Sequence, residues 1–308
     1  MVSIAVVGNV NVDLLAWPAD HVPPPGTERP LERIDVRVGG GAAIAAAALA
    51  RLGRDPIVAG CVGDDALGTA ALDELSRYGV DTGWIRRIEG APTGVSIAFE
   101  ATGRERSFLI ALGSLALFEP SMVPAEALTA SIVLACGYFN LPAMRGAATE
   151  DLLRAVKAAD GTTMLDTGWD HDGWPDATRD EVARLLRAVD VFVPNAAEAR
   201  AITGEPDPAD AARALSSSSG GWTVVKLGAD GCVAAGPDGH LHRAVAPVVD
   251  VVDTTGAGDA FNAGLIDALA SGRSVREALH TAVAVASAVV GRASNDRYPS
   301  ASEVAAPS

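Results

Sequence analysis

The segment from Val251 to Phe261, VVDTTGAGDAF, places glycines and a carboxylate at the start of a predicted helix. Apolar residues continue at helical spacing after Asp259, which puts Gly256, Ala257 and Gly258 at the helix N-terminus. The exposed N–H groups and the dipole of such a terminus favour an anion, and small residues allow its close approach. A carboxylate repels phosphate, so Asp259 is better explained as a base that takes a hydroxyl proton while the amides hold the transferred group. The alternative is a glycine-containing helix start in which Asp259 is only a cap.

A second polar group follows the first predicted strand, which ends at Gly8. If the chain stays extended, Asn9, Asn11 and Asp13 point to one side, because side chains alternate along a strand. Their donors and acceptors suit a polyol. A turn stabilised by these same side chains is the simpler alternative. Asn140 follows another apolar strand and is a further candidate for this site.

Three other segments have residue types that suit ligand binding. The glycines Gly39, Gly40 and Gly41 precede an alanine-rich helix and allow close approach of backbone to hydroxyl groups. Asn195 and Glu198 lie at a strand-to-helix junction, where Glu198 either offsets the helix dipole or binds a magnesium ion through water. Lys226 ends a strand and either meets phosphate or caps the strand at the surface.

The order of predicted elements indicates the fold class. From about residue 130 onward, apolar strands alternate with amphipathic helices, which is typical of a parallel sheet covered on both faces. The first third differs, because residues 96–100 and 106–110 flank a polar turn and predict a hairpin. Strands without helices between them are expected in a small antiparallel flap. The valines of residues 248–252 predict one more strand end.

The sequence resembles the PfkB, or ribokinase-like, family of carbohydrate and nucleoside kinases. Asp253–Asp259 matches the family pattern Asp-Thr-x-Gly-Ala-Gly-Asp in full. The resemblance implies a three-layer α/β/α sandwich with a mostly parallel central sheet and a small β-sheet lid. It predicts one domain over residues 1–308, with lid segments at about 12–38 and 93–112 and a frayed tail at 300–308. The absence of a Gly-Lys dipeptide excludes a Walker A loop.

The resemblance also assigns expected roles to particular residues. It implies an ATP-dependent sugar kinase in which Asp259 is the base and Mg²⁺ offsets phosphate charge. A nucleoside kinase and a non-catalytic sugar-binding relative are the alternatives. Ile44 stands where the family usually has Asn, which makes the region more apolar. The remaining expected ligands are acceptor-binding Asp13, Asn11, Gly39, Gly40, Gly41 and Asn140; ATP-binding Asn195, Lys226, Gly228, Gly231 and Thr255; Glu198 for Mg²⁺ through water; and Asp253 for a monovalent cation such as K⁺.

Composition limits the partners. The formal charge of −15 over 308 residues argues against nucleic acid. Cys61, Cys136 and Cys232 are far apart in sequence, which suits reduced thiols in a cytoplasmic protein better than zinc. No segment is typical of a membrane span. The family resemblance implies a small sugar or nucleoside as the partner, and we also expect a homodimer through the lid.

Overall fold

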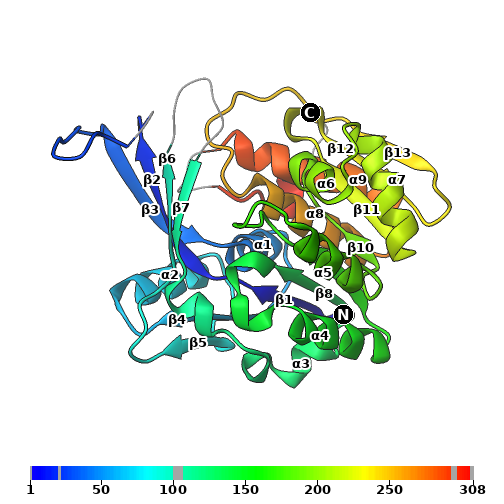
Figure 1. Cartoon of the computed structure of the whole chain (residues 1–308), viewed down its shortest axis with the longest axis horizontal. Helices are drawn as coiled ribbons and strands as arrows, with labels where there is room; N and C mark the ends of the chain where they lie inside the picture. Colours follow the sequence, from blue (N-terminus) through cyan, green and yellow to red (C-terminus); the bar gives the residue numbers. More distant parts are fainter. Residues whose placement is uncertain (1, 20–21, 100–106, 293–296, 306–308) are drawn as a thin grey trace.

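A computed structural model of the chain describes residues 2–19, 22–99, 107–292 and 297–305. Its body is a nine-stranded sheet between two layers of helices (Figure 1). The seven strands from β11 to β5 in the sheet order pair in parallel, whereas β12 and β13 are antiparallel at one edge. In sheet order the strands are β13 (Leu241–Ala244), β12 (Cys232–Ala235), β11 (Trp222–Lys226), β10 (Val191–Phe192), β9 (Thr162–Asp166), β8 (Ile132–Cys136), β1 (Ile4–Gly8), β4 (Ile57–Gly63) and β5 (Ile85–Ile88).

Both faces of the sheet are buried. Along β1, Ile4 and Val6 belong to one core cluster, and Ala5 and Val7 belong to the other. Such alternation explains the continuous apolar strands, because each face packs on helices. The first cluster packs α1 (Gly41–Arg51), α2 (Ala66–Arg77), α8 (Ala257–Ala270) and α9 (Val275–Val290); the second packs α3 (Ala125–Leu128), α4 (Ala147–Ala158), α5 (Asp176–Leu186), α6 (Ala196–Thr203) and α7 (Pro208–Ser219).

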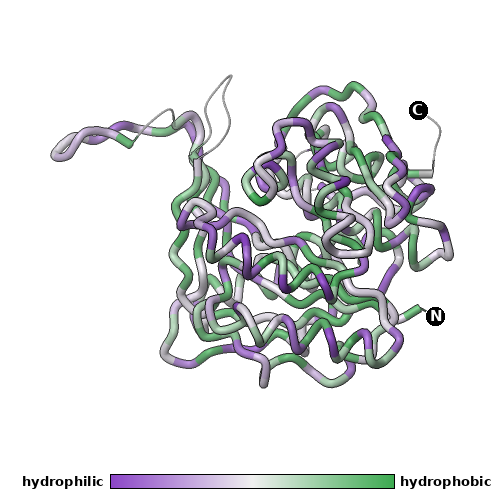
Figure 2. The backbone as a smooth tube through the Cα atoms, turned by 45° about the vertical axis from the view of Figure 1, so that its right-hand side comes forward, coloured by the Kyte–Doolittle hydropathy of each residue, from purple (hydrophilic) through white to green (hydrophobic). Residues whose placement is uncertain are grey.

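The lid is a separate four-stranded sheet in the order β3 (Arg33–Gly39), β2 (Asn11–Trp17), β6 (Val95–Phe99) and β7 (Ser107–Ala111). The predicted hairpin is confirmed as β6 and β7, although its turn lies outside the described residues. The lid is not wholly antiparallel as expected, because β2 and β6 pair in parallel. The chain passes through β3, α1, β4, α2 and β5 between them, and such a long connection permits parallel pairing. In Figure 2 the described residues that lead into β3 extend from the body at the upper left.

Two other expectations differ from the structure. Residues 248–252 form no strand, and Val248 and Val251 are exposed, because this segment runs outside the sheet beside a cavity. The expected frayed tail contains the short helix α10 (Ala301–Ala305), whose first turn is stabilised by hydrogen bonds from Ser300 to Glu303. Among the described residues, no helix has the length and apolarity that crossing a membrane requires.

Candidate active site

Parallel strands bring the predicted site residues to one edge of the sheet. Asn9 directly follows β1, Asp166 ends β9, and Lys226 ends β11. In open α/β sheets the carboxyl ends of the strands form the usual ligand-binding edge. The N-termini of α1 and α8 also lie at this edge. Gly41 at the start of α1 adjoins Asn9, and Gly258 at the start of α8 adjoins Lys226. The fold therefore unites residues from both ends of the chain.

The N-terminus of α8 has the features of an anion site. Gly256 caps it with φ of +70°, a conformation that favours glycine, and no described side chain caps the helix. A Cβ on Gly258 would lie 3.5 Å from Lys226 Nζ, so the ammonium group adjoins the first turn. A Cβ on Gly256 would lie only 2.8 Å from Ile44 Cδ1. Ile44 therefore packs against the anion loop and is buried in the core.

Lys226 is held in a partly buried ion pair. Its Nζ lies 2.6 Å from Asp166 Oδ2, and Asn262 Nδ2 donates to that same oxygen at 2.6 Å. Burial alone would lower the pKa of Lys226. The negative charges of Asp166 and Glu198 raise it by a larger amount, so the net shift is upward. The lysine thus stays charged beside α8. This geometry contradicts the alternative of a surface strand cap and agrees with a group that meets phosphate.

Asp259 lies between the two helix N-termini. A Cβ on Gly41 would lie 3.0 Å from Asp259 Oδ1 and 3.4 Å from Asn9 Oδ1. Burial, followed by the negative charge of Asp166, raises the pKa of Asp259 to about 7, although Lys226 acts in the opposite direction. A carboxyl with a pKa near neutrality is suited to proton transfer.

The polar residues after β1 form a chain of hydrogen bonds along one side, as the alternation predicted. Asn9 Nδ2 donates to Asn11 Oδ1 at 3.2 Å, and Asn11 Nδ2 donates to Asp13 Oδ1 at 2.9 Å. The glycines before α1 fit closely around them, since a Cβ on Gly39 would lie 2.1 Å from Asp13 Oδ1 and one on Gly40 would lie 2.6 Å from Asn11 Oδ1. Burial raises the pKa of Asp13 to about 6.

Asn140 lies in a short 3₁₀ turn after β8. Its Oδ1 is 2.9 Å from Nε2 of His171, a residue of the loop after β9. Both residues lie beyond the carboxyl ends of strands, in the segments that follow the neighbouring strands β8 and β9. The expected contact of Asn140 with the acceptor stays a prediction.

Asn195 and Glu198 form a capping box at the start of α6. Asn195 Oδ1 accepts from the Glu198 N–H, and Glu198 Oε2 accepts from the Asn195 N–H, each at 2.9 Å. The structural alternative is therefore present. Glu198 is nevertheless buried, and burial followed by the charge of Asp166 raises its pKa. Its carboxyl thus belongs to the same electrostatic group as Lys226 and Asp166.

A cavity of about 390 Å³ lies beside α8. Lys226 and Gly258 are at its polar end, while exposed valines and α9 supply apolar walls. Of the described residues expected to bind ATP, Asn195 and Thr255 lie outside this lining. The sequence analysis noted the valines of residues 248–252, but it did not predict that they and most of the other apolar residues line a cavity. The lining residues are Lys226, Gly228, Ala229, Gly231, Ala246, Pro247, Val248, Val249, Val251, Thr254, Ala257, Gly258, Phe261, Ala286, Ser287 and Val290.

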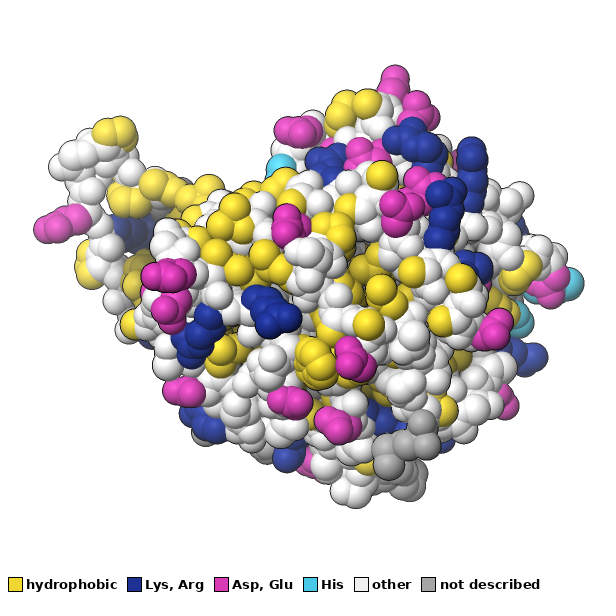
Figure 3. Space-filling model, turned by 90° about the horizontal axis from the view of Figure 1, so that it is seen from below, with side chains coloured by type: hydrophobic (Ala, Val, Ile, Leu, Met, Phe, Trp, Pro, Cys, Tyr) yellow, Lys and Arg dark blue, Asp and Glu magenta, His cyan; other side chains and the backbone are white. Residues whose placement is uncertain are grey.

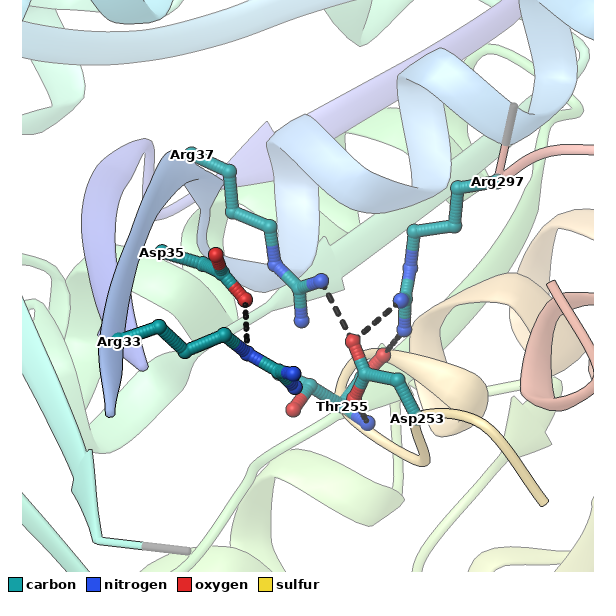
Figure 4. A network of polar contacts seen from close by, with 6 residues as sticks. All are labelled: Arg33, Asp35, Arg37, Asp253, Thr255 and Arg297. Carbon is teal, nitrogen blue, oxygen red and sulfur yellow. Dashed lines mark hydrogen bonds and ion pairs between the residues drawn. The ribbon is translucent and has the colours of Figure 1, made fainter. Parts of the chain in front are cut away.

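Asp253 does not have the surroundings expected for a K⁺ ligand. Its Oδ2 lies 2.5 Å from Arg37 Nη1 and 2.6 Å from Arg297 Nη1 (Figure 4). Burial alone would raise the pKa of Asp253, but Arg297 and then Arg37 lower it well below its usual range. The guanidinium of Arg297 also donates to the Thr255 carbonyl. The carboxylate that was expected to bind a metal cation therefore binds two arginines, and one of them also binds the neighbouring Thr255 carbonyl.

Neither arginine was identified from the sequence. The alternation of Arg33, Asp35 and Arg37 along β3 was a usable signal, because it puts three charged residues on one face of the lid. Arg297 offered no such pattern, because it stands in the polar segment SNDRYPS, which has neither helical nor strand periodicity.

Comparison with known proteins gives the family. The model of the pfkB family of carbohydrate kinases matches residues 1–300. This chain belongs to that family. A 2-dehydro-3-deoxygluconokinase of Thermoproteus tenax is 31% identical to it over 79% of this chain and 76% of its own length. The pfkB assignment makes the chain an ATP-dependent sugar kinase.

Solved pfkB-type structures agree with the observed fold. The structure of Arabidopsis thaliana ribokinase, complexed with ribose and ATP, has a TM-score of 0.83 and 26% identity, covering 98% of this chain and 97% of that one. Adenosine kinase from Sinorhizobium meliloti also has a TM-score of 0.83 and 26% identity, over 94% of each chain. These values confirm the three-layer sandwich with a lid that the sequence resemblance implied.

Proposed function

We propose that this kinase transfers the γ-phosphoryl group of ATP to a primary hydroxyl of a sugar, with Asp259 as the base. The position of the Asp259 carboxyl carries the proposal. On one side, Gly258 and Lys226 lead to the apolar cavity. On the other, Gly41 and Asn9 lead to the hydrogen-bonded row that ends at Asp13. The carboxyl thus stands where an acceptor and a phosphate would meet.

In this mechanism the two sides have separate tasks. Asp13 and Asn11 accept and donate hydrogen bonds to acceptor hydroxyls, which orients one hydroxyl toward Asp259. Asp259 takes that proton as the oxygen attacks the γ-phosphorus, and the bond from this phosphorus to the β,γ-bridging oxygen breaks, so that ADP leaves. Amides of Gly256, Ala257 and Gly258, together with Lys226, hold the charge on the transferred group. The adenine of ATP is assigned to the apolar part of the cavity, beside Gly228 and Gly231.

The residues at hand fit a magnesium ion bound largely through its own waters. Mg²⁺ usually takes one or two carboxylates plus phosphate oxygens. Glu198 and Asp166 are two buried carboxyls whose charges both act on Lys226, and burial followed by the negative charge of Asp166 raises the pKa of Glu198. Within the described residues, no cluster of three His, Cys, Asp or Glu forms a complete protein cage. When bound, the ion neutralises phosphate charge.

The inner face of the lid favours a nucleoside as the second candidate acceptor. In the strand pairing Asp13 lies beside Ser96, and Ser96 lies opposite Ile110, so the three side chains share one face. Phe108 is two residues from Ile110 and therefore also points inward, and both are exposed. An aromatic and an aliphatic side chain over the acceptor row would suit a base. The chain has an aspartate at the position of the proposed base, Asp259, which disfavours the non-catalytic alternative.

An acceptor panel tests the proposal. Pentoses, hexoses, sugar acids, sugar phosphates and nucleosides are each incubated with MgATP, and ADP formation is measured. We expect polyhydroxylated sugars to give the highest kcat/KM. A ranking led by nucleosides would select the second candidate, and ADP formation that no acceptor increases would refute both.

The charge distribution supports a small-molecule partner. The face in Figure 3 carries acidic and basic side chains intermixed, without a broad basic patch. The homodimer and the cytoplasmic location stay predictions. Ile34 and Val36 on β3 alternate with Arg37, so they lie on the outer lid face, where they are exposed. Sedimentation of the purified protein would test whether this face joins two copies.

A further inference from the structure

Figure 4 shows the loop before α8 held by two arginines from distant parts of the chain. Asp253 Oδ2 accepts from Nη1 of both Arg37 and Arg297, at 2.5 and 2.6 Å. The other carboxylate oxygen accepts from the Thr255 N–H at 2.8 Å. Arg297 Nη2 donates to the Thr255 carbonyl. One guanidinium therefore bridges a carboxylate and a backbone carbonyl within the same three-residue turn.

This contact acts on the first amide of the anion site. The Thr255 carbonyl and the Gly256 N–H belong to one peptide unit, which is planar and trans, so they point in opposite directions. A donor that fixes the carbonyl therefore also fixes the direction of the Gly256 N–H. Gly256 then enters α8 with φ of +70°. Electrostatic stabilisation depends on donors that are oriented before the reaction begins.

The atoms around Arg297 would otherwise suit a metal cation. A carboxylate and a carbonyl are hard oxygen ligands. A guanidinium keeps its charge at all working pH values and supplies two parallel donors. Arg297 is 2% exposed and Arg37 is 9% exposed, so water competes little with these bonds. A free ion would have to displace a buried side chain that is already linked to the chain.

We propose that Arg297 is a positioning residue that replaces a monovalent cation at the anion site, so that turnover does not depend on K⁺ or Na⁺. Arg37 assists from the lid strand β3, where it pairs with Asp13 across the β2–β3 ladder. The role assigned to the Gly256 amide rests on the proposed function. The replacement of the ion by a side chain rests on the contacts of Asp253 and Thr255 alone.

The first experiment needs only the unmodified protein. Steady-state rates are measured with MgATP and the best acceptor in KCl, NaCl, guanidinium chloride or choline chloride at constant, low ionic strength. We expect kcat in choline and in K⁺ to differ by less than about twofold. Activation by K⁺ of tenfold or more over choline would overturn the proposal. Protein that forms no ADP with any acceptor would instead refute the proposed function.

The second experiment removes the guanidinium. For Arg297→Ala in choline we expect kcat to fall by about 10²-fold, comparable with loss of an oriented donor, while KM for the acceptor changes less. Added guanidinium or K⁺ should raise the kcat of Arg297→Ala at least tenfold above its value in choline. Arg297→Lys keeps the charge but not the paired donors, so its kcat in choline should fall less than that of Arg297→Ala. A variant with full kcat in choline, or a loss that no cation restores, would contradict the proposal.

A control and a second readout complete the test. Arg54 forms a comparable ion pair with Asp267, at 2.7 Å, farther along α8. Arg54→Ala should show no loss of kcat that cations restore.

The melting temperature of Arg297→Ala should rise in KCl relative to choline chloride, whereas the melting temperature of the unmodified protein should not. This readout needs no turnover, so it tests the site even if the proposed function fails, and an equal response of both proteins would overturn the proposal. If Arg297→Ala does not fold, Arg297→Lys is compared with the unmodified protein in the same salts.

Discussion

The N-termini of α1 and α8 share one backbone feature and present opposite chemistry. Each is preceded by a glycine in the left-handed region, with φ of +93° at Gly40 and +70° at Gly256. Carboxylate and amide oxygens surround the start of α1, including those of Asp13 and Asn11. The start of α8 instead faces the ammonium group of Lys226. One terminus therefore suits hydroxyl groups, and the other suits phosphate.

The difference arises from the neighbouring strands and not from the helices. The oxygens at α1 come from the chain directly after β1, whereas Lys226 comes from the end of β11. A helix N-terminus supplies donors and a positive potential in both cases. The proposed function assigns hydroxyl groups to one terminus and phosphate to the other because of the side chains beside them. Asp259 adjoins the first turns of both helices.

Loss of the shared carboxyl should have the largest effect. Asp259→Asn keeps the volume but cannot accept the proton, so kcat should fall by about 10²–10⁴-fold or more. ATP should still bind, which isothermal titration would measure. Asp267→Asn, on the same helix but paired with Arg54, should stay active. Near-normal turnover by a folded Asp259→Asn protein would remove Asp259 from the role of base.

A change at the α1 side should separate the two sites. Asp13→Ala removes hydrogen bonds to a charged group, each typically worth about 1.5–3 kcal/mol, so KM for the acceptor should rise about 10- to 100-fold. KM for ATP should change much less. Asp35→Ala alters a half-exposed carboxylate on the same face of the lid, in the neighbouring strand β3, and serves as the control. Equal effects on both KM values would assign Asp13 to the scaffold.

The pH dependence of turnover should show whether the charge of Asp166 raises the pKa of Asp259. A base acts only when deprotonated, and the pKa of Asp259 is raised to about 7, so under the proposed mechanism acceptor kcat/KM should rise with pH and level off above this value. Asp166 contributes to the upward shift, so Asp166→Asn should move the acidic limb to lower pH. The exposed Asp238→Asn should leave the limb in place. An unchanged limb in Asp166→Asn would contradict the electrostatic coupling.

The smallest effect on acceptor choice is expected at Ile44. Its side chain packs against Gly256 and is buried, so it does not line the acceptor row. Ile44→Asn should lower the melting temperature, because a buried amide without partners costs about 1–3 kcal/mol. The ranking of acceptors should stay unchanged, with Ile44→Val as the milder control. A shift toward polyhydroxylated sugars would show that Ile44 contacts the acceptor.

Much of the fold could be predicted because its signals are local. Alternating apolar strands and amphipathic helices indicated the parallel sheet, and the glycine turn between apolar runs indicated the β6–β7 hairpin. The parallel pairing of β2 with β6 could not be predicted, because it joins segments separated by a long crossover. The valines at 248–252 were mistaken for a strand, since residues that line an apolar cavity and residues of a strand have the same composition.

The sequence by itself determined the reactive parts of this protein. Gly256, Gly258 and Asp259 are neighbours in the chain, so their spacing and the helix that follows already specify an amide-lined terminus with a carboxyl. Only the tertiary structure decided what surrounds that terminus. Arg37 and Arg297 reach Asp253 from 216 and 44 residues away. Residue spacing sets dihedral angles and periodicity over a few residues, but contacts between distant side chains depend on how the packed elements meet.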